Sequence, residues 1–372
     1  MPTDDRLIFP RVGPPGALEP EPRLYPEELQ LASRNRAMPL EALRWDITPT
    51  GMHYLLVHYD VQMVDAAGWR LDIGGAVERP MTLSLADLKA RPSRTLAVTL
   101  QCAGDGRALL NPRPISQPWL YGAVGTAEWT GTPLAPLLEE AGMADDTVDV
   151  VFTALDRGIE ARLEQQYERA LSRAESLRPG VILAWAMNGQ PLEPQHGAPV
   201  RLVAPGWYGM AHVKWLSSIT AIGQPYAGYQ NTTAYRYGEK REPPGAAVEL
   251  MQVRSMMVPP GIPDFMTRTR VCRAGAVPLE GRAWSGRSMI VRVEVSADSG
   301  ASWWDAVVDP PPGPHAWQRW SATWKAVPGQ DELRCRATDA NGATQPVEQA
   351  WTARGMGNNQ AHRVPVMVLA VP

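Results

Sequence analysis

Cys102 is the residue of this sequence best placed to do chemistry. It ends an apolar run and enters a glycine-rich turn, Gln101-Cys102-Ala103-Gly104-Asp105-Gly106-Arg107. Gly104 and Gly106 let the backbone bend tightly and approach a ligand. A guanidinium such as that of Arg107 lowers the pKa of a nearby thiol and holds anions. The segment therefore predicts a nucleophilic cysteine or a soft-metal ligand, against the commoner role of a lone cysteine as a small buried apolar residue.

Four cationic or potentially cationic residues form a second set, His196, Arg201, His212 and Lys214. They flank expected strand ends and the glycine-rich segment from Pro205 to Trp215. Such groups on adjoining strand ends suit a phosphate-bearing cofactor. By spacing alone, solvated surface charge and one core histidine are the commoner explanation.

Composition and missing motifs exclude several classes of protein. The sequence contains no GxGxxG, GxxxxGK[ST], GxSxG or HExxH signature. Its three cysteines, Cys102, Cys272 and Cys335, cannot build a disulfide framework and include no CxxC pair. Lys plus Arg is 36 against 39 for Asp plus Glu, so no basic nucleic-acid footprint exists.

The sequence shows no membrane or export segment. The longest apolar run, about residues 181–187, is far shorter than a membrane span requires, and no export signal is visible at the start. We therefore expect no membrane association and a cytoplasmic location, or a periplasmic one if the chain has been trimmed.

The 372 residues, 44% of them apolar and 20% charged, indicate a globular chain of two domains. Prolines throughout the first 22 residues predict an extended arm over residues 1–45. Residues 46–240 mix strands with short helices, including one opened by a capping box at 84–87 and one capped by Thr132 ahead of Pro133. From 246 to 372, alternating strands and turns predict a β-sandwich, after a linker at 237–245.

Taken in order, these segments resemble the sulfite oxidase family of molybdenum-pterin oxidoreductases. The resemblance runs from about Trp45 to the C-terminus. It rests on five segments in the family's order and near its spacing: residues 101–107, 122–129, 187–192, 196–201 and 212–215. It implies an α+β fold class, with a mixed α+β molybdopterin-binding catalytic domain followed by an immunoglobulin-like β-sandwich dimerisation domain.

The resemblance also implies a site. Cys102 would supply the single protein thiolate to molybdenum, with one molybdenum-molybdopterin cofactor per chain. The pterin and its phosphate would be held by Tyr54, His58, Cys102, Asp156, His196, Arg201, His212, Val213 and Lys214. Arg107 and Arg354, one from each domain, would bind a small anionic substrate, sulfite. Tyr235 matches the family's active-site tyrosine and Trp119 its pocket-wall tryptophan; without the resemblance they would be linker surface and core.

The activity implied is oxidation of sulfite to sulfate by oxygen-atom transfer, in a homodimer. No haem segment is visible, so electrons would pass to a separate acceptor such as a c-type cytochrome. Leu56, in Tyr54–His58, stands where sulfite-oxidising members carry an arginine. Two alternatives therefore stay open: a related molybdenum enzyme acting on sulfane sulfur or a sulfoxide, and a non-enzymatic β-sandwich binding protein.

Overall fold

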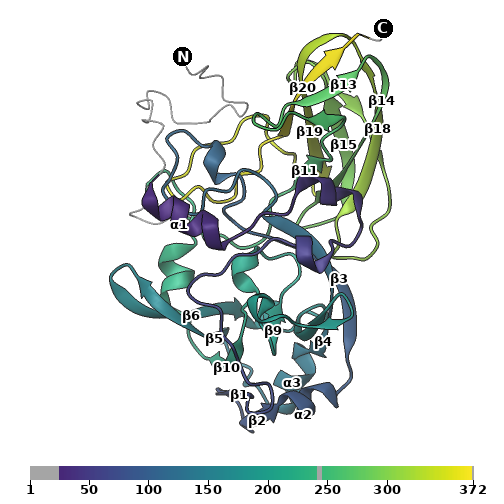
Figure 1. Ribbon diagram of the computed structural model, residues 1–372. Coiled ribbons are helices and arrows are strands. Elements are labelled where there is room, and N and C mark those ends of the chain that lie inside the picture. Colours follow the sequence, from purple (N-terminus) through teal and green to yellow (C-terminus); the bar gives the residue numbers. More distant parts are fainter. Residues whose placement is uncertain (1–24, 241–244, 371–372) are drawn as a thin grey trace.

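The computed structural model describes residues 25–240 and 245–370, in which strands carry most of the fold and the helices are short (Figure 1). The structure has two bodies, the first within residues 25–240 and the second within residues 245–370. The lower sheet of the first body has the strand order β2-β1-β10-β5-β6. β1 and β10 are parallel, and the other pairs are antiparallel. These strands are β1 (Arg70–Gly75), β2 (Met81–Ser84), β5 (Asp149–Glu160), β6 (Leu163–Ser172) and β10 (Leu216–Ile222).

A second sheet, of order β3-β4-β7-β8, carries the cysteine turn at the end of β3. Its strands are β3 (Arg94–Gln101), β4 (Val124–Pro133), β7 (Ile182–Met187) and β8 (Gln190–Pro191), with β9 (Arg201–Val203) pairing β7. Asn188 and Gly189, a pair typical of tight hairpin turns, are both at positive φ and connect β7 to β8. β9 places Arg201 beside the turn that leads to β10.

Three short helices pack beside these sheets: α2 (Leu85–Lys89), α3 (Leu134–Glu140) and α4 (Arg173–Ser176). Ser84 caps α2 through the predicted capping box. The prediction for α3 is wrong by one residue, because Pro133 is the N-cap and Thr132 donates its hydroxyl to the Leu88 carbonyl, 2.9 Å away. Single helical turns cover Leu40–Arg44, Thr50–Met52, Arg107–Leu109, Pro194–His196, Gly209–Ala211 and Gln230–Ala234.

The described part of the predicted arm is not extended throughout. Residues 1–24 lie outside the described residues, but α1 (Pro26–Arg34) is a helix with Pro26 at its first position, where proline is favourable. Glu28 of α1 is buried and accepts two 2.7 Å hydrogen bonds from Arg113. Further on, Met38 and Leu43 are buried in the core of the first body. Residues 26–44 therefore pack onto that body.

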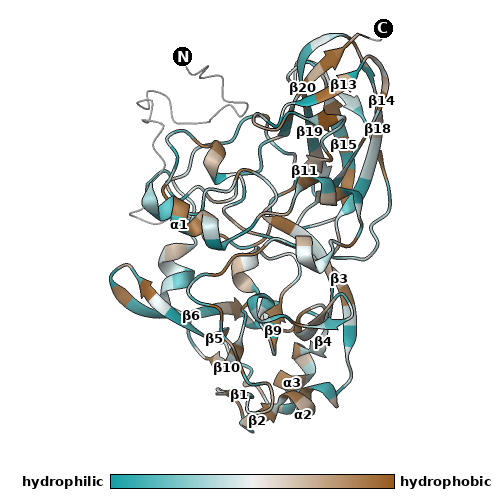
Figure 2. Ribbon diagram, viewed as in Figure 1, coloured by the Kyte–Doolittle hydropathy of each residue, from teal (hydrophilic) through white to brown (hydrophobic). Residues whose placement is uncertain are grey.

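The second body is a two-sheet sandwich. One sheet has the order β11-β14-β18-β17 and the other β12-β13-β20-β19-β15-β16. Hydrophobic and hydrophilic residues alternate along several of these strands (Figure 2), so each sheet turns one apolar face inward. The strands are β11 (Arg254–Met257), β12 (Ile262–Pro263), β13 (Arg270–Arg273), β14 (Gly275–Trp284), β15 (Ile290–Ser296), β16 (Trp304–Asp305), β17 (Val307–Val308), β18 (Gln318–Ala326), β19 (Gly329–Asp339) and β20 (His362–Leu369).

The predicted α+β fold class is confirmed only in part, in the division into two bodies of which the second is a β-sandwich. A sheet-rich body with a few short helices precedes a β-sandwich, so the α+β label describes a minor part of the chain, and an immunoglobulin-like topology stays a prediction. The proposed linker at 237–245 includes residues 241–244, which lie outside the described residues. None of the helices in the described ranges is long and apolar enough to cross a membrane.

Candidate active site

Cys102 lies just after β3, where the chain leaves the second sheet. Its backbone N–H donates to the Ala123 carbonyl at 2.8 Å, and the Gly104 N–H lies 3.4 Å from its Sγ. The residue is 9% exposed, and that small surface lines two cavities. Burial raises the pKa of the thiol, while nearby Arg107 acts to lower it. Cys102 is thus one of the four residues that line both cavities, with Leu56, His58 and Tyr235.

The inner cavity lies in the first body and has a volume of about 70 Å³. Segments far apart in sequence form it: the 53–58 stretch, the end of β3, β5, and the turns on either side of β9. The predicted cofactor-binding residues that line it are Tyr54, His58, Cys102, Asp156, His196, Arg201, His212 and Lys214. Val213 is buried in the core instead, and its carbonyl accepts a hydrogen bond from Leu202 N–H at 2.8 Å.

Arg201 dominates the charge of the inner cavity. Its Nη1 and Nη2 donate to the carbonyls of His196 and His212, at 3.0 and 3.1 Å, and its guanidinium lies over the Trp129 ring. Its Nε is buried without a hydrogen-bond partner. Burial lowers the pKa of Arg201 to about 10, which still leaves it charged at neutral pH.

Lys214 and Asp156 face the same cavity. Lys214 Nζ donates to the carbonyls of Leu56 and Gln195, at 2.8 and 3.0 Å, and burial together with Arg201 lowers its pKa to about 7. Burial raises the pKa of Asp156 to about 6. The His196 ring forms no hydrogen bond with a described residue. The pKa of His196 is lowered to about 2, and burial is the largest cause. The cationic groups of the cavity outnumber its carboxylate.

His212 plays a different part from the one expected. Its Nδ1 lies 3.2 Å from the Ala204 N–H and its Nε2 lies 3.1 Å from the Trp207 carbonyl, so both ring nitrogens are used within the chain. A neutral imidazole that accepts at Nδ1 and donates at Nε2 satisfies both contacts. His212 therefore holds the turn that carries Lys214 and has no ring nitrogen left for a ligand.

The outer funnel, with a volume of about 440 Å³, opens on the other side of Cys102. All the residues predicted to be catalytic line it, namely Cys102, Arg107, Trp119, Tyr235 and Arg354. Arg107 Nε donates to the Arg354 carbonyl and Nη1 to the Gln117 carbonyl, both at 3.0 Å. The Tyr235 hydroxyl lies 3.4 Å from His58 Nε2. No described residue pairs with the Arg354 guanidinium.

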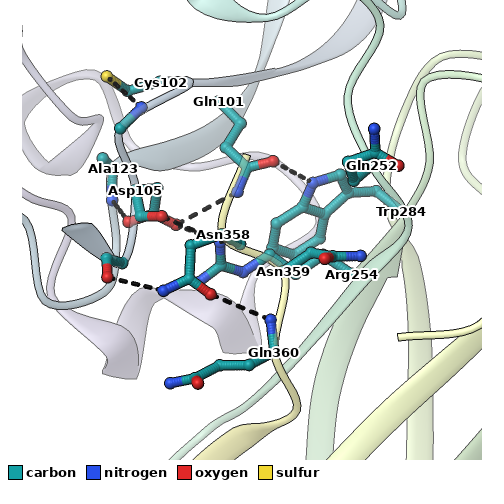
Figure 3. Close-up of polar contacts among 12 residues, drawn as sticks. Gln101, Cys102, Asp105, Ala123, Gln252, Arg254, Trp284, Asn358, Asn359 and Gln360 are labelled. Atoms are coloured by element: carbon teal, nitrogen blue, oxygen red, sulfur yellow. Dashed lines mark hydrogen bonds and ion pairs between the residues drawn. The ribbon is translucent and has the colours of Figure 1, made fainter. Parts of the chain in front are cut away.

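The second body clamps the cysteine turn. Arg254 of β11 forms a buried ion pair with Asp105, 3.3 Å apart, and also donates to the Asn358 carbonyl at 2.5 Å (Figure 3). Asn358 Nδ2 donates in turn to the Gly106 carbonyl at 2.8 Å. The Asp105 carboxylate also accepts the Ala123 N–H at 3.0 Å. These contacts fix the turn from both bodies.

Two more contacts across the same interface support the turn. The Trp284 indole of β14 donates to Gln101 Oε1 at 3.0 Å, as Figure 3 shows. The Gly357 N–H donates to the Ala103 carbonyl at 2.7 Å. The segment 354–360, which alone resembles an ordinary turn, thus lies against the turn that carries Cys102.

Sequence reasoning missed His53 and Glu160. His53 lines the inner cavity with Nδ1 3.0 Å from the Tyr54 carbonyl and Nε2 buried without a partner. Its spacing of five from His58 matches no common zinc motif, so the sequence alone does not mark it. Glu160 lines the outer funnel from the tip of β5. The sequence does not identify Glu160 as a site residue, because it reaches the outer funnel only through the folding of the long β5–β6 hairpin.

The inner cavity fits an anionic pterin cofactor. It combines a single thiol with cationic groups that have no carboxylate partners and with unpartnered polar atoms, Arg201 Nε and His53 Nε2. Buried polar atoms normally have partners, and a phosphate or a pterin edge would supply them. One thiol beside such a group suits a soft metal that takes its other sulfurs from the cofactor.

Comparisons with known proteins identify the class. Residues 58–230 match the oxidoreductase molybdopterin binding domain, and residues 246–369 match the Mo-co oxidoreductase dimerisation domain. The chain is 32% identical to the sulfite oxidase of Gallus gallus over 347 residues, which cover 85% of this chain and 72% of that protein. The chain therefore belongs to the sulfite oxidase family of molybdenum oxidoreductases, and its cofactor is molybdenum-molybdopterin.

Other relatives show how broad the family is. The mitochondrial sulfite oxidase of Macaca fascicularis is 34% identical over 342 residues, covering 87% of this chain and 62% of that one. The chain thus spans less than two thirds of that relative. A NADH nitrate reductase of Oryza sativa subsp. japonica is 30% identical, with 38% of its length covered. The sulfane dehydrogenase SoxCD of Paracoccus pantotrophus has a TM-score of 0.78 at 26% identity, covering 92% of this chain and 85% of that one.

Proposed function

We propose that this chain oxidises sulfite to sulfate by oxygen-atom transfer and passes the electrons to a separate acceptor. One observation carries the proposal. Cys102 lines both a cationic cavity suited to the cofactor and a funnel with two arginines suited to an oxyanion. A sulfur oxyanion in the funnel would therefore meet the metal at Cys102.

The inner cavity would hold the cofactor through groups with complementary charge. The Cys102 thiolate would bind the metal, and Arg201, His196 and Lys214 would bind the phosphate and pterin from cationic or polar atoms that face the cavity. Asp156 can accept hydrogen bonds from a pterin N–H. When bound, the molybdenum-pterin group supplies oxygen-atom transfer and takes up two electrons.

The outer funnel would bind and orient the substrate. Arg354 is free to donate to an oxyanion, and Arg107 keeps Nη2 free because backbone carbonyls hold its other nitrogens. Guanidinium groups suit trigonal oxyanions because they donate parallel hydrogen bonds. The Tyr235 hydroxyl can donate to a substrate oxygen, and Trp119 walls the funnel. The substrate sulfur is thereby left to face Cys102.

The rest of the assembly is proposed on the same basis. We assign catalysis to residues 46–240 and homodimer formation to residues 246–372, which contain the dimerisation-domain match. A c-type cytochrome is the proposed electron acceptor. The cytoplasmic location stays a prediction from the sequence.

Sulfane sulfur is the second candidate substrate. The structural likeness to a sulfane dehydrogenase supports it, as does Leu56, which lines the junction of both cavities without adding positive charge. Oxidation of thiosulfate or of a protein persulfide, with no turnover of sulfite, would favour this candidate.

Replacing the metal-binding thiol tests the proposal. We expect Cys102→Ser to lower sulfite-dependent ferricyanide reduction by at least about 1000-fold, since one ligand and its geometry are lost. Cys272→Ser is the matched control, because Cys272 is also buried but lies in the sandwich core. Equal activity in wild type and Cys102→Ser would refute the proposal. A wild type that retains no molybdenum would favour a binding protein.

A further inference from the structure

The outer funnel is wider than a sulfite ion requires, and part of its wall is apolar. Its volume is about 440 Å³, whereas sulfite is one sulfur with three oxygens and offers no apolar surface. Leu31 of α1, Leu56, Ile115 and Met356 line it together with the Trp119 ring. A stretch of apolar wall such as this one can hold an apolar group of a ligand whose polar part binds elsewhere in the funnel.

The charge of the funnel suits a monoanion better than a dianion. Its two arginines face one carboxylate, that of Glu160. The Tyr59 hydroxyl and Gln230 Nε2 donate to Glu160 Oε2 at 3.2 and 3.0 Å and hold the carboxylate on the funnel wall. Leu56, at the junction of the cavities, contributes apolar surface where a further cation would suit sulfite. The balance favours a monoanion.

We propose that the funnel takes organic sulfinates, R–SO2⁻, and that the chain oxidises them to sulfonates in preference to sulfite. A sulfinate keeps the lone pair on sulfur, carries one negative charge, and replaces one oxygen of sulfite by a carbon substituent. The two arginines bind its oxygens, and R lies along the wall formed by Leu56, Ile115 and Met356.

The reaction is R–SO2⁻ + H2O → R–SO3⁻ + 2 H⁺ + 2 e⁻. One S–O bond forms, the S–C bond is kept, and sulfur loses two electrons. Both electrons leave one at a time to an added acceptor, ferricyanide in the experiment below. This inference rests on the proposed function, because the oxygen transfer needs the same cofactor.

Turnover and binding test the inference on the cofactor-loaded protein. We expect kcat/KM for benzenesulfinate to exceed that for sulfite by about tenfold or more, with benzenesulfonate as the product. Calorimetry gives a readout that does not depend on turnover. Benzenesulfonate, the product, should bind at least about tenfold more tightly than sulfate, because its ring buries apolar surface in the funnel.

Two pairs of variants locate the effect. Leu56→Arg should shift the preference toward sulfite by about tenfold, since it adds a cation at the junction. Val327→Arg adds the same charge at a site 72% exposed and outside both cavities, and should leave the preference unchanged. Ile115→Ala should weaken benzenesulfonate binding about threefold or more but not sulfate binding. Ile159→Ala, at a residue 72% exposed, should change neither.

The outcomes separate the two proposals. If the loaded protein oxidises sulfite but not benzenesulfinate, and binds benzenesulfonate no better than sulfate, the sulfinate inference is overturned and the proposed function stands. If it oxidises neither compound, both fail. Should Leu56→Arg not fold, the Ile115→Ala binding data decide.

Discussion

Buried cations without carboxylate partners distinguish the inner cavity from the core around it. Arg201 donates hydrogen bonds from two nitrogens to backbone carbonyls, and its Nε has no partner. The His53 ring likewise has no partner at Nε2. Such groups lower the stability of the cofactor-free protein. Binding of an anion supplies their missing partners and therefore stabilises the folded state. The sequence identified Arg201 as a candidate cofactor-binding residue because it is cationic. It could not show these unpaired atoms, because three separate segments create the burial.

The His53 ring gives a prediction for the cofactor-free protein. Its pKa is lowered to about 4, first by burial, from 6.5. Between these values the unfolded chain binds the extra proton and the folded chain does not, so stability falls as pH falls. From pH 6.5 to 4, wild type should lose up to about 3 kcal/mol more unfolding free energy than His53→Phe. Urea denaturation across this range measures it, and parallel curves would contradict it.

The cysteine turn is the element on which both cavities depend. The sequence predicted the capping box of α2, and the apolar run before Cys102 forms β3, because both depend on local spacing. It failed at α1, where prolines upstream suggested an extended chain. It also misplaced the start of α3, because a tertiary contact takes the Thr132 hydroxyl. Local signals thus predicted elements best where no distant partner competes.

Gly104 tests whether this turn sets the position of Arg107. A Cβ added there would lie 2.5–2.6 Å from the Arg107 guanidinium, the mobile end of a long side chain. Gly104→Ala should therefore displace Arg107, raising KM for the substrate about tenfold while costing less than about 1 kcal/mol of stability. Gly51→Ala, where nothing lies within 4 Å of the added carbon, is the control. An unchanged KM would show that the position of Arg107 does not matter.

At the scale of the whole molecule, the second body completes the site. Arg354 lines the funnel, while Arg254 and Asn358 hold the cysteine turn across the interface. The sequence and its resemblance predicted two domains with one arginine from each. The Asp105–Arg254 pair was not predicted, because neither neighbourhood in sequence reveals a partner 149 residues away. The sandwich therefore positions the cysteine turn, in addition to any role in dimer formation.

The buried pair gives a prediction at this scale. Arg254→Met leaves the Asp105 carboxylate buried without its cation, so unfolding free energy should drop by about 3–5 kcal/mol and molybdenum retention should fall. Adding Asp105→Asn should recover part of the loss. Arg157→Met removes an exposed pair with Glu164 and should cost at most about 1 kcal/mol. Denaturation curves measure the unfolding free energies, and metal analysis measures the bound molybdenum. Equal losses of unfolding free energy for the two arginine variants would refute the role of the Asp105–Arg254 pair in holding the cysteine turn.

An anaerobic titration of the cofactor-loaded protein with sulfite tests the central claim most directly. The visible thiolate-to-molybdenum absorption is followed in wild type and in Cys102→Ser. We expect one equivalent of sulfite per bound molybdenum to bleach the wild-type band and to yield one equivalent of sulfate, while Cys102→Ser shows no such band. A wild-type band that persists in excess sulfite would contradict the assignment of sulfite as substrate. A band that survives in Cys102→Ser would contradict Cys102 as the metal ligand.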